Sequence, residues 1–200
     1  MNVRSLIHKL FELQVVKFGT FQLKSGVQSP IYIDLRRTIS YPKLLVAIAE
    51  VMHEKMRDCQ YDLVCGVPYT ALPFATALSI QHSIPMVMRR KEKKEYGTGQ
   101  MIEGVFEPGQ RCLVIEDVIT SGQSILETAA PLQQAGLIVQ DAVVLVDREQ
   151  GGVKRLKEQS IQVHTICTLT QIIDELLHVR AIDHKTAVSV QQFIKDNQHA

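Results

Sequence analysis

The chain has 200 residues, of which 46% are hydrophobic and 22% charged, and its formal net charge is +1. This length fits one domain with a sizeable core, and the near-neutral charge gives no sign of bulk attraction to nucleic acid or membranes. The four cysteines form no CxxC pair and the seven histidines no HExxH spacing, so we expect a cytoplasmic protein with buried free thiols and no zinc site.

The first part of the chain is expected to form a helix, a hairpin and a second helix. Apolar residues at 3–13 recur at helical spacing, and the charged residues among them argue against a signal peptide. Residues 19–23 and 31–35 are typical of two strands joined by a turn at 24–26. A proline then opens a helix that is expected to span 42–57.

Strands and helices alternate through the rest of the chain. Strands are expected at 63–67, 85–89, 113–115, 142–146 and 161–166, and helices at 71–82, 125–135, 169–178, 184–197 and directly after Gly152. Residues 100–106 fit either an edge strand or a loop arm. The alternation predicts an α/β fold with a doubly wound, mainly parallel sheet. Ligands of such sheets bind beyond the carboxyl ends of the strands, where the turns after Val67, Ile115 and Val146 fall.

One of these turns has the composition of a phosphate site. The apolar run at 113–115 is followed by Glu116 and Asp117, and then by a turn of small hydroxylated residues at 120–124. N–H groups of a glycine-containing turn, together with the N-terminus of the following helix, favour an anion. Carboxylates repel phosphate but accept hydrogen bonds from a sugar diol, so a ribose phosphate would satisfy both halves. An ordinary strand-to-helix turn with a Ser or Thr cap is the alternative.

Several stretches resemble one enzyme family. IEDVITSGQS at 115–124 is similar to the signature of type I phosphoribosyltransferases that binds 5-phosphoribosyl 1-diphosphate (PRPP). Five other stretches resemble orotate phosphoribosyltransferases, in the form found as the N-terminal half of UMP synthase. They are LKSG at 23–26, SPIYIDLR at 29–36, CGVPYTALP at 65–73, RRKEKKEYGT at 89–98 and LVDREQGG at 145–152.

The resemblance covers almost the whole chain and implies one domain, residues 1–200, with the type I phosphoribosyltransferase fold. Its parts would be an N-terminal helix and hood at 1–40, a PRPP-binding core at 60–168 and C-terminal helices at 169–200. A flexible basic lid loop would follow the strand at 85–89. The basic run also fits a solvated surface loop, but glycines flank it and favour a lid.

The resemblance also implies a reaction. The phosphoribosyl group of PRPP would pass to N1 of orotate, giving orotidine 5′-monophosphate and pyrophosphate in UMP biosynthesis. Mg²⁺ would be the cofactor, held mainly by PRPP and water rather than directly by side chains. The enzyme would be a homodimer whose lid reaches the neighbouring subunit, with no nucleic-acid or membrane partner.

Matching positions supply the expected site residues. The catalytic residues would be Lys24, Lys94 and Asp117, and the orotate-binding residues Tyr32, Ile33, Thr120 and Arg148. The PRPP-binding residues would be Lys24, Tyr69, Thr70, Arg90, Lys91, Lys94, Tyr96, Glu116, Asp117, Val118, Ile119, Thr120, Ser121, Gly122, Gln123 and Ser124. Two positions depart from many relatives, which have Lys in place of Thr70 and His in place of Tyr96. Both departures leave fewer cations near the diphosphate.

Two other functions fit parts of this pattern. A phosphoribosyltransferase for a purine or another base would keep the PRPP site and change only the base pocket. A non-enzymatic sensor of PRPP would use the same fold. The sequence shows neither a basic face nor a helix-turn-helix pattern, and it retains the whole basic loop, so an enzyme is favoured.

Overall fold

The structure is a computed structural model that describes residues 1–22, 26–90 and 101–198. Its strands are β1 (Val16–Gln22), β2 (Gln28–Ile33), β3 (Leu63–Gly66), β4 (Met86–Arg89), β5 (Ile102–Glu103), β6 (Cys112–Ile119), β7 (Asp141–Asp147) and β8 (Gln162–Thr168). Its α-helices are α1 (Val3–Glu12), α2 (Pro42–Lys55), α3 (Ala71–His82), α4 (Gln123–Gln134), α5 (Gly152–Glu158), α6 (Leu169–His178) and α7 (His184–Asp196). Two 3-10 helices, η1 (Leu35–Ser40) and η2 (Met56–Asp58), complete the elements of the described residues.

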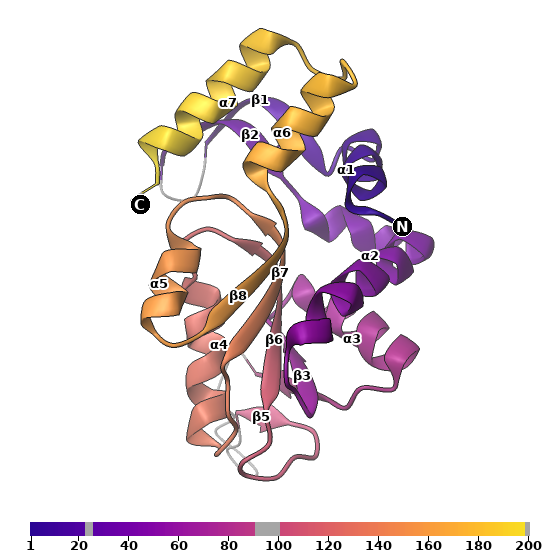
Figure 1. Cartoon of the computed structure of the whole chain (residues 1–200), viewed down its shortest axis with the longest axis vertical. Coiled ribbons are helices and arrows are strands. Elements are labelled where there is room, and N and C mark those ends of the chain that lie inside the picture. The colour runs from indigo at the N-terminus through magenta and orange to yellow at the C-terminus, as the bar shows by residue number, and fades with distance from the viewer. Residues whose placement is uncertain (23–25, 91–100, 199–200) are drawn as a thin grey trace.

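Six strands form a central sheet in the order β5-β4-β3-β6-β7-β8, with helices on both of its faces (Figure 1). The pairs from β4 through β8 are parallel, and β5 joins the edge of the sheet antiparallel to β4. The predicted doubly wound, mainly parallel sheet is therefore confirmed. The edge-strand alternative for residues 100–106 is the correct one, although only Ile102 and Glu103 pair with β4.

The sheet has a separate hydrophobic core on each face. Along β7, Val143 and Leu145 pack with buried residues of α1, α2, α3, α6 and α7. Ala142 and Val144 point the other way and pack with buried residues of α4 and α5. Because both faces are covered, β7 is buried over nearly its whole length, as a continuous apolar run predicts for a parallel strand.

The β1–β2 hairpin forms a second, smaller layer with α1, α6 and α7 at one end of the sheet (Figure 1). Helix α7 packs against β2, and α6 packs against both α1 and α7. The chain enters α6 directly from β8, where Thr168 and Gln171 form a capping box that satisfies two backbone N–H groups of the helix start. The last two helices thereby hold the hairpin over the sheet.

Two predicted strand boundaries next to this hairpin are wrong. Strand β6 does not stop before Glu116 but continues to Ile119, because Val118 and Ile119 pair with Val146 and Asp147 of β7. Strand β2 ends at Ile33, and Leu35 begins η1 instead of extending the strand. The carbonyl oxygen of Leu35 accepts a hydrogen bond from Thr38 Oγ1 at 2.6 Å, which closes the turn of η1.

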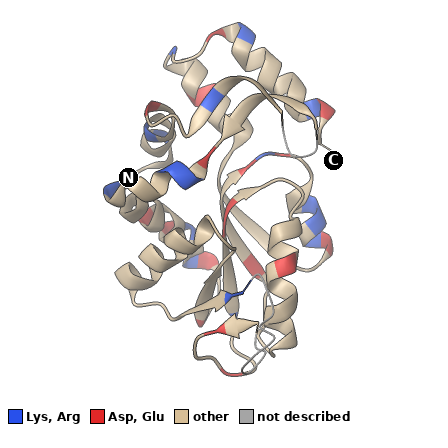
Figure 2. Ribbon diagram, turned by 180° about the vertical axis from the view of Figure 1, so that it is seen from behind, with Lys and Arg blue, Asp and Glu red and all other residues tan. Residues whose placement is uncertain are grey.

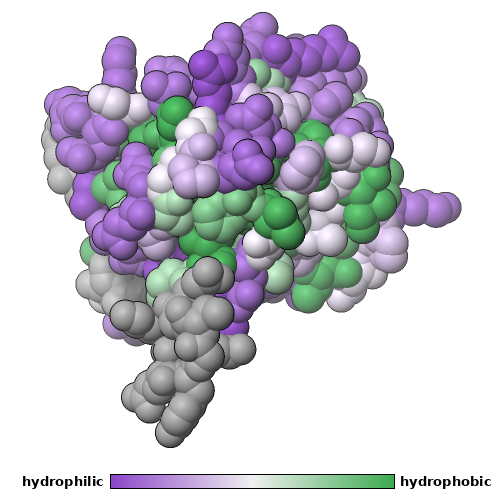
Figure 3. Space-filling model, turned by 90° about the horizontal axis from the view of Figure 1, so that it is seen from below, coloured by the Kyte–Doolittle hydropathy of each residue, from purple (hydrophilic) through white to green (hydrophobic). Residues whose placement is uncertain are grey.

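The surface mixes polar and apolar side chains. Basic and acidic positions are interspersed along the helices (Figure 2). On the end opposite the hairpin, apolar side chains lie between polar ones (Figure 3). Among the described residues, no helix combines the length and the apolar character that crossing a membrane requires.

Candidate active site

A pocket of about 710 Å³ lies between the hairpin layer and the carboxyl ends of the central strands. Five segments line it: Gln22 at the end of β1, the end of β2 with η1, the turn after β3, the end of β6 with the start of α4, and Arg148 after β7. This arrangement confirms the prediction that the turns after the strands meet at one edge of the sheet. Another hollow, of about 810 Å³, lies between α1, β1 and the connection from α6 to α7. It contains none of the predicted site residues.

The turn before α4 has the geometry of an anion site. Gly122 stands at the N-cap of α4 with φ of 75°, and no side chain caps this helix end. Residues 120–124 line the pocket. Uncapped N–H groups and the helix dipole both favour an anion at such an end.

A glycine from the next strand-to-helix connection supports this turn. The N–H of Gly152 donates to the carbonyl oxygen of Thr120 at 2.9 Å. A Cβ added at Gly152 would lie 2.5 Å from that oxygen and 2.8 Å from the nitrogen of Gly122. The close approach therefore requires glycine. From the sequence, the glycine pair at 151–152 was predicted to lead into a helix and to end the LVDREQGG stretch, but its contact with the turn at 120–124 was not predicted.

Arg155 of α5 also contacts the turn. Its Nη1 donates to the carbonyl oxygen of Ser121 at 3.3 Å, and its Nη2 donates to Gln123 Oε1 at 2.8 Å. These bonds orient two residues of the turn at 120–124, called the cradle from here on, and Arg155 makes them from outside the pocket. Arg155 was not among the predicted residues, and no sequence motif distinguishes it from other helical arginines.

Glu116 and Asp117 both line the pocket, but their environments differ. Glu116 is only 4% exposed, and burial, followed by the hydrogen bond and charge of Asp117, raises the pKa of Glu116 well above its usual range. The carboxylate also accepts the N–H of Asp117 at 3.0 Å. Asp117 is partly exposed, so it is the more accessible of the two carboxylates.

Arg148 offers an anion-binding group on the other side of the pocket. Its Nε and Nη2 atoms are buried and have no hydrogen-bond partner among the described residues. Burial lowers the pKa of Arg148, yet a guanidinium stays charged at neutral pH. Its backbone N–H donates to the carbonyl oxygen of Ile119 at 3.0 Å. Arg148 as a whole is partly exposed, and its two buried nitrogens without a partner would be stabilised by hydrogen bonds to an anion.

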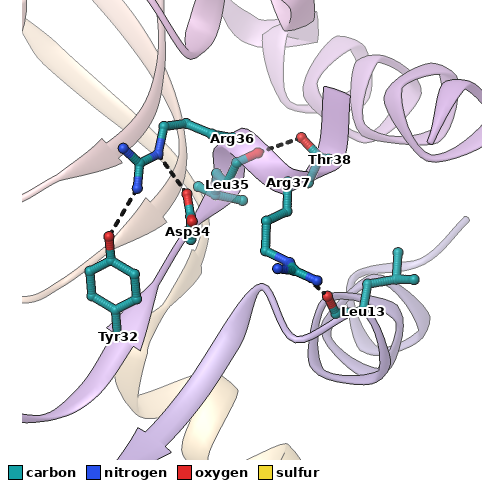
Figure 4. A network of polar contacts seen from close by, with 7 residues as sticks. All are labelled: Leu13, Tyr32, Asp34, Leu35, Arg36, Arg37 and Thr38. Carbon is teal, nitrogen blue, oxygen red and sulfur yellow. Dashed lines mark hydrogen bonds and ion pairs between the residues drawn. The ribbon is translucent and has the colours of Figure 1, made fainter. Parts of the chain in front are cut away.

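The hairpin side of the pocket is built around Tyr32 (Figure 4). Arg36 donates from Nη2 to the Tyr32 hydroxyl at 2.9 Å and from Nε to Asp34 Oδ1 at 2.6 Å. The Tyr32 ring stacks on Phe21 with centroids 5.4 Å apart. The neighbouring Arg37 points away, toward the carbonyl oxygen of Leu13 (Figure 4). Sequence reasoning missed Arg36 as a pocket residue, although it ends the SPIYIDLR stretch.

The turn after β3 forms another wall of the pocket, at Val67, Pro68, Tyr69 and Thr70. The N–H of Val67 donates to the carbonyl oxygen of Ile115 at 2.9 Å, and the peptide bond between Pro68 and Tyr69 is cis. A Cβ on Gly66 would lie 2.9 Å from the carbonyl oxygen of Ala71. The end of β3 therefore packs so closely against the start of α3 that no side chain fits at position 66.

The predicted residues divide into three groups. Those that line the pocket are Tyr32, Ile33, Tyr69, Thr70, Glu116, Asp117, Val118, Ile119, Thr120, Ser121, Gly122, Gln123, Ser124 and Arg148. Lys24, Lys91, Lys94 and Tyr96 lie outside the residues that the structure describes. Arg90 is not part of the pocket lining, and its Nη1 pairs with Glu103 Oε1 of β5 at 2.8 Å.

Comparison with known proteins gives a family match over most of the pocket segments. Residues 39–166 match the family described as phosphoribosyl transferase domain. The match spans more than half of the chain and includes the turn after β3, both acids and the cradle. The chain belongs to the phosphoribosyltransferase family. Within this phosphoribosyltransferase, the matched region provides every pocket segment except the hairpin side.

Individual relatives show to which branch of the family the chain belongs. The orotate phosphoribosyltransferase of Caenorhabditis elegans is 45% identical over 170 residues, which cover 84% of this chain and 75% of that protein. The uridine 5′-monophosphate synthase of Bos taurus is 50% identical over 195 residues, or 96% of this chain and 41% of that protein. The chain thus spans about two fifths of the length of the bovine protein. The relatives that it covers over most of their length are orotate phosphoribosyltransferases, so it belongs to that branch.

A solved structure supports the same assignment. The orotate phosphoribosyltransferase from Aeropyrum pernix superposes with a TM-score of 0.77 and 32% identity, covering 86% of this chain and 97% of that one. The UMP synthase structure from Leishmania donovani gives a TM-score of 0.88 and 33% identity, covering 96% of this chain and 42% of that one. The hairpin layer and the sheet therefore both have counterparts in solved members.

Proposed function

We propose that the 710 Å³ pocket binds PRPP and orotate, and that the chain forms orotidine 5′-monophosphate and pyrophosphate in pyrimidine biosynthesis. One observation carries the proposal: an uncapped helix start, two acids and an unpartnered guanidinium line the same pocket. Each group suits a different part of the two substrates.

PRPP fits the β6–α4 side of the pocket. Residues 120–124 would hold the 5′-phosphate, because the N-terminus of α4 is uncapped and its dipole favours an anion. Asp117 and Glu116 would accept hydrogen bonds from the ribose hydroxyls. The diphosphate would then extend toward the turn at 67–70, which lines the same pocket.

Orotate fits between Arg148 and the hairpin. Its carboxylate would receive two hydrogen bonds from the buried Nε and Nη2 of Arg148, which is the bidentate geometry that guanidinium and carboxylate groups share. Tyr32 and Ile33 would bound the flat ring, with the hydroxyl of Tyr32 oriented by Arg36. Thr120, the first residue of the turn at 120–124, would also lie near the pyrimidine.

The reaction would rely on alignment rather than on a protein nucleophile. The C1′–O bond to diphosphate would break while N1 of orotate approaches the opposite face, through a transition state with oxocarbenium character. The proton of N1 would pass to solvent or to the leaving pyrophosphate. The carboxylate of Asp117 would stabilise the positive charge that develops on the ribose. Lys94 is proposed to stabilise the leaving pyrophosphate, and Lys24 to lie over the ligand at the reaction centre. Both residues lie outside the described part of the chain.

An oxygen-rich pocket of this kind fits Mg²⁺, which prefers oxygen ligands and retains several waters. Asp117 is the partly exposed carboxylate that such an ion would reach, whereas Glu116 is buried, and burial raises its pKa well above the usual range. When bound with PRPP, the ion neutralises diphosphate charge. The residues of the chain would orient the two substrates around the ion.

A second copy of the chain is proposed to cover apolar side chains next to the sheet edge. Ile80 of α3 is 76% exposed and Met88 of β4 is 46% exposed, and these two elements pack together. Ile80→Asp is expected to convert a dimer to a monomer in light-scattering measurements. Val188→Asp on α7, where the native side chain is 48% exposed, is the control and should leave the mass unchanged. A dimer that survives Ile80→Asp would place the interface elsewhere.

The deciding experiment follows the ultraviolet absorbance of orotate in the presence of PRPP and Mg²⁺. Loss of orotate absorbance with release of pyrophosphate supports the proposal, and consumption of a purine base instead would reassign the base pocket.

In single-turnover assays, Asp117→Asn is expected to slow the chemical step by roughly 100-fold or more. Asp174→Asn, at an exposed position of α6, is the matched control and should leave the rate unchanged.

A further inference from the structure

A second cluster of metal-ligand side chains lies at the opposite end of the central sheet. Asp141 is the first residue of β7, His164 is in β8, and Cys59 directly follows η2. One ligand atom of each residue lies within 4.8 Å of those of the other two. Because β7 is seven residues long, this cluster is about 20 Å from the pocket end of the strand.

The parallel pairing of β7 and β8 brings two of the three residues, Asp141 and His164, close together. Val143 is in register with His164, so Asp141, two positions earlier, points to the same face of the sheet. His164 Nε2 and Asp141 Oδ1 are 2.6 Å apart in a hydrogen bond. This contact orients the imidazole toward the face on which α2 packs.

The third residue, Cys59, lies in the segment that follows α2 and η2. The helix packs against β7 and β8, and η2 continues from its end. The N–H of Cys59 donates to the carbonyl oxygen of Met56 at 2.9 Å, which closes η2 and fixes the cysteine. The three residues are far apart in the sequence, which is why no spacing motif shows them.

The cluster is open enough for an ion to enter. Cys59 is partly exposed. The side chains of His164 and Asp141 remain 20% and 23% exposed, so an ion and a water molecule can reach them.

We propose that Cys59, Asp141 and His164 bind one zinc ion, with water as the fourth ligand. Thiolate and imidazole together select zinc over magnesium. Tetrahedral coordination separates nitrogen and oxygen ligands by about 3.3 Å, so binding opens the His164–Asp141 hydrogen bond by less than 1 Å. The thiol proton passes to solvent as the sulfur–zinc bond forms.

The ion would connect the segment after α2 to two neighbouring strands of the sheet, β7 and the edge strand β8. Cys59 belongs to the segment after η2, whereas Asp141 and His164 belong to the sheet. A bound ion therefore resists separation of this segment from β7 and β8 and stabilises the folded state. It takes no part in phosphoribosyl transfer, because the cluster is at the far end of β7 from the pocket.

Cobalt substitution tests the site, since tetrahedral Co²⁺ bound by a thiolate gives a near-ultraviolet charge-transfer band. The metal-free protein is expected to bind one equivalent of Co²⁺ with this band, to lose it on adding Zn²⁺, and to keep it in excess Mg²⁺. Cys59→Ala should abolish the band and weaken Zn²⁺ binding by roughly 100-fold or more. His164→Gln and Asp141→Asn should weaken binding in the same direction.

The chain offers a matched control in His8, whose Nε2 is 2.8 Å from Glu175 Oε1. This pair has the same imidazole–carboxylate contact but belongs to no cluster with a cysteine among the described residues. His8→Asn should keep the band, and Zn²⁺ should raise the melting temperature of this variant but not of Cys59→Ala. The inference is overturned if the wild-type protein shows no thiolate band, or if Cys59→Ala retains it. Circular dichroism of the variants checks that they fold.

Discussion

The backbone N–H of Gly152 donates to the carbonyl oxygen of Thr120 across 2.9 Å. This bond joins the start of α5 to the turn before α4, so the turn at 120–124 is held by two neighbouring strand-to-helix connections. The separation leaves no room for a side chain at position 152, because a Cβ would lie 2.5 Å from the Thr120 oxygen.

Gly152→Ala is therefore expected to displace the turn at 120–124. The KM for PRPP should rise by roughly 10-fold or more, and the free energy of unfolding should fall by about 1–3 kcal/mol, the usual cost of overpacking. Steady-state kinetics and urea denaturation measure the two effects. Gly109→Ala is the control, because it strains a backbone with φ of +90° where a Cβ meets nothing within 4 Å. Gly109→Ala should lower the free energy of unfolding without changing the KM for PRPP. An unchanged KM in Gly152→Ala would mean that the contact between α5 and the turn does not affect PRPP binding.

The order of strands and helices was predictable because buried parallel strands are short apolar runs. The end of β6 was not predictable in this way. Glu116 and Asp117 interrupt the apolar run, yet the ladder with β7 continues to Ile119 and keeps these acids within a strand. Backbone pairing with a neighbour is a tertiary effect that the local pattern does not contain.

Arg148→Lys is expected to raise the KM for orotate much more than that for PRPP. Lysine has one ammonium group and cannot reproduce a bidentate contact from Nε and Nη2. Loss of a hydrogen bond to a charged group costs about 1.5–3 kcal/mol, which corresponds to roughly 10- to 150-fold in KM. Initial rates with each substrate varied in turn give both constants. Arg37→Lys is the control, because this residue bonds to Leu13 outside the pocket, and equal effects on both substrates in Arg148→Lys would argue against an orotate role.

Arg155→Met is expected to weaken PRPP binding without slowing the chemical step. The change removes the hydrogen bonds to Ser121 and Gln123, each worth about 0.5–1.5 kcal/mol, so the KM for PRPP should rise several-fold. Lys154→Met alters the exposed neighbour on the same helix and should change nothing. A large fall in the single-turnover rate of Arg155→Met would indicate that this residue does more than position the cradle.

The site residues differ in how far the sequence could reveal them. Those within a motif, such as Thr120 or Arg148, follow from the resemblance. Arg155 contacts the cradle from a separate helix, and His164 meets Asp141 from 23 positions away. Such contacts depend on the register of strands and helices, which the pattern of apolar residues leaves open.

Glu116→Gln is expected to change how stability depends on pH. Burial raises the folded-state pKa of Glu116 well above 4.5, so its contribution to stability is complete below that pH and is lost as the pH rises through the folded-state pKa. Each unit that separates the two pKa values is worth about 1.4 kcal/mol. Glutamine stays neutral, so the free energy of unfolding of the variant should fall less steeply with pH than that of the wild-type protein.

Urea denaturation over a series of pH values measures this difference, because other carboxylates cancel when the variant is compared with the wild-type protein. Glu158→Gln, at an exposed position of α5, should reproduce the wild-type profile. Parallel profiles for Glu116→Gln and the wild-type protein would mean that Glu116 ionises as easily in the folded chain as in the unfolded one. In that case the carboxyl group would face the ribose as an anion, and Asp117 would not be the only charged acid of the pair.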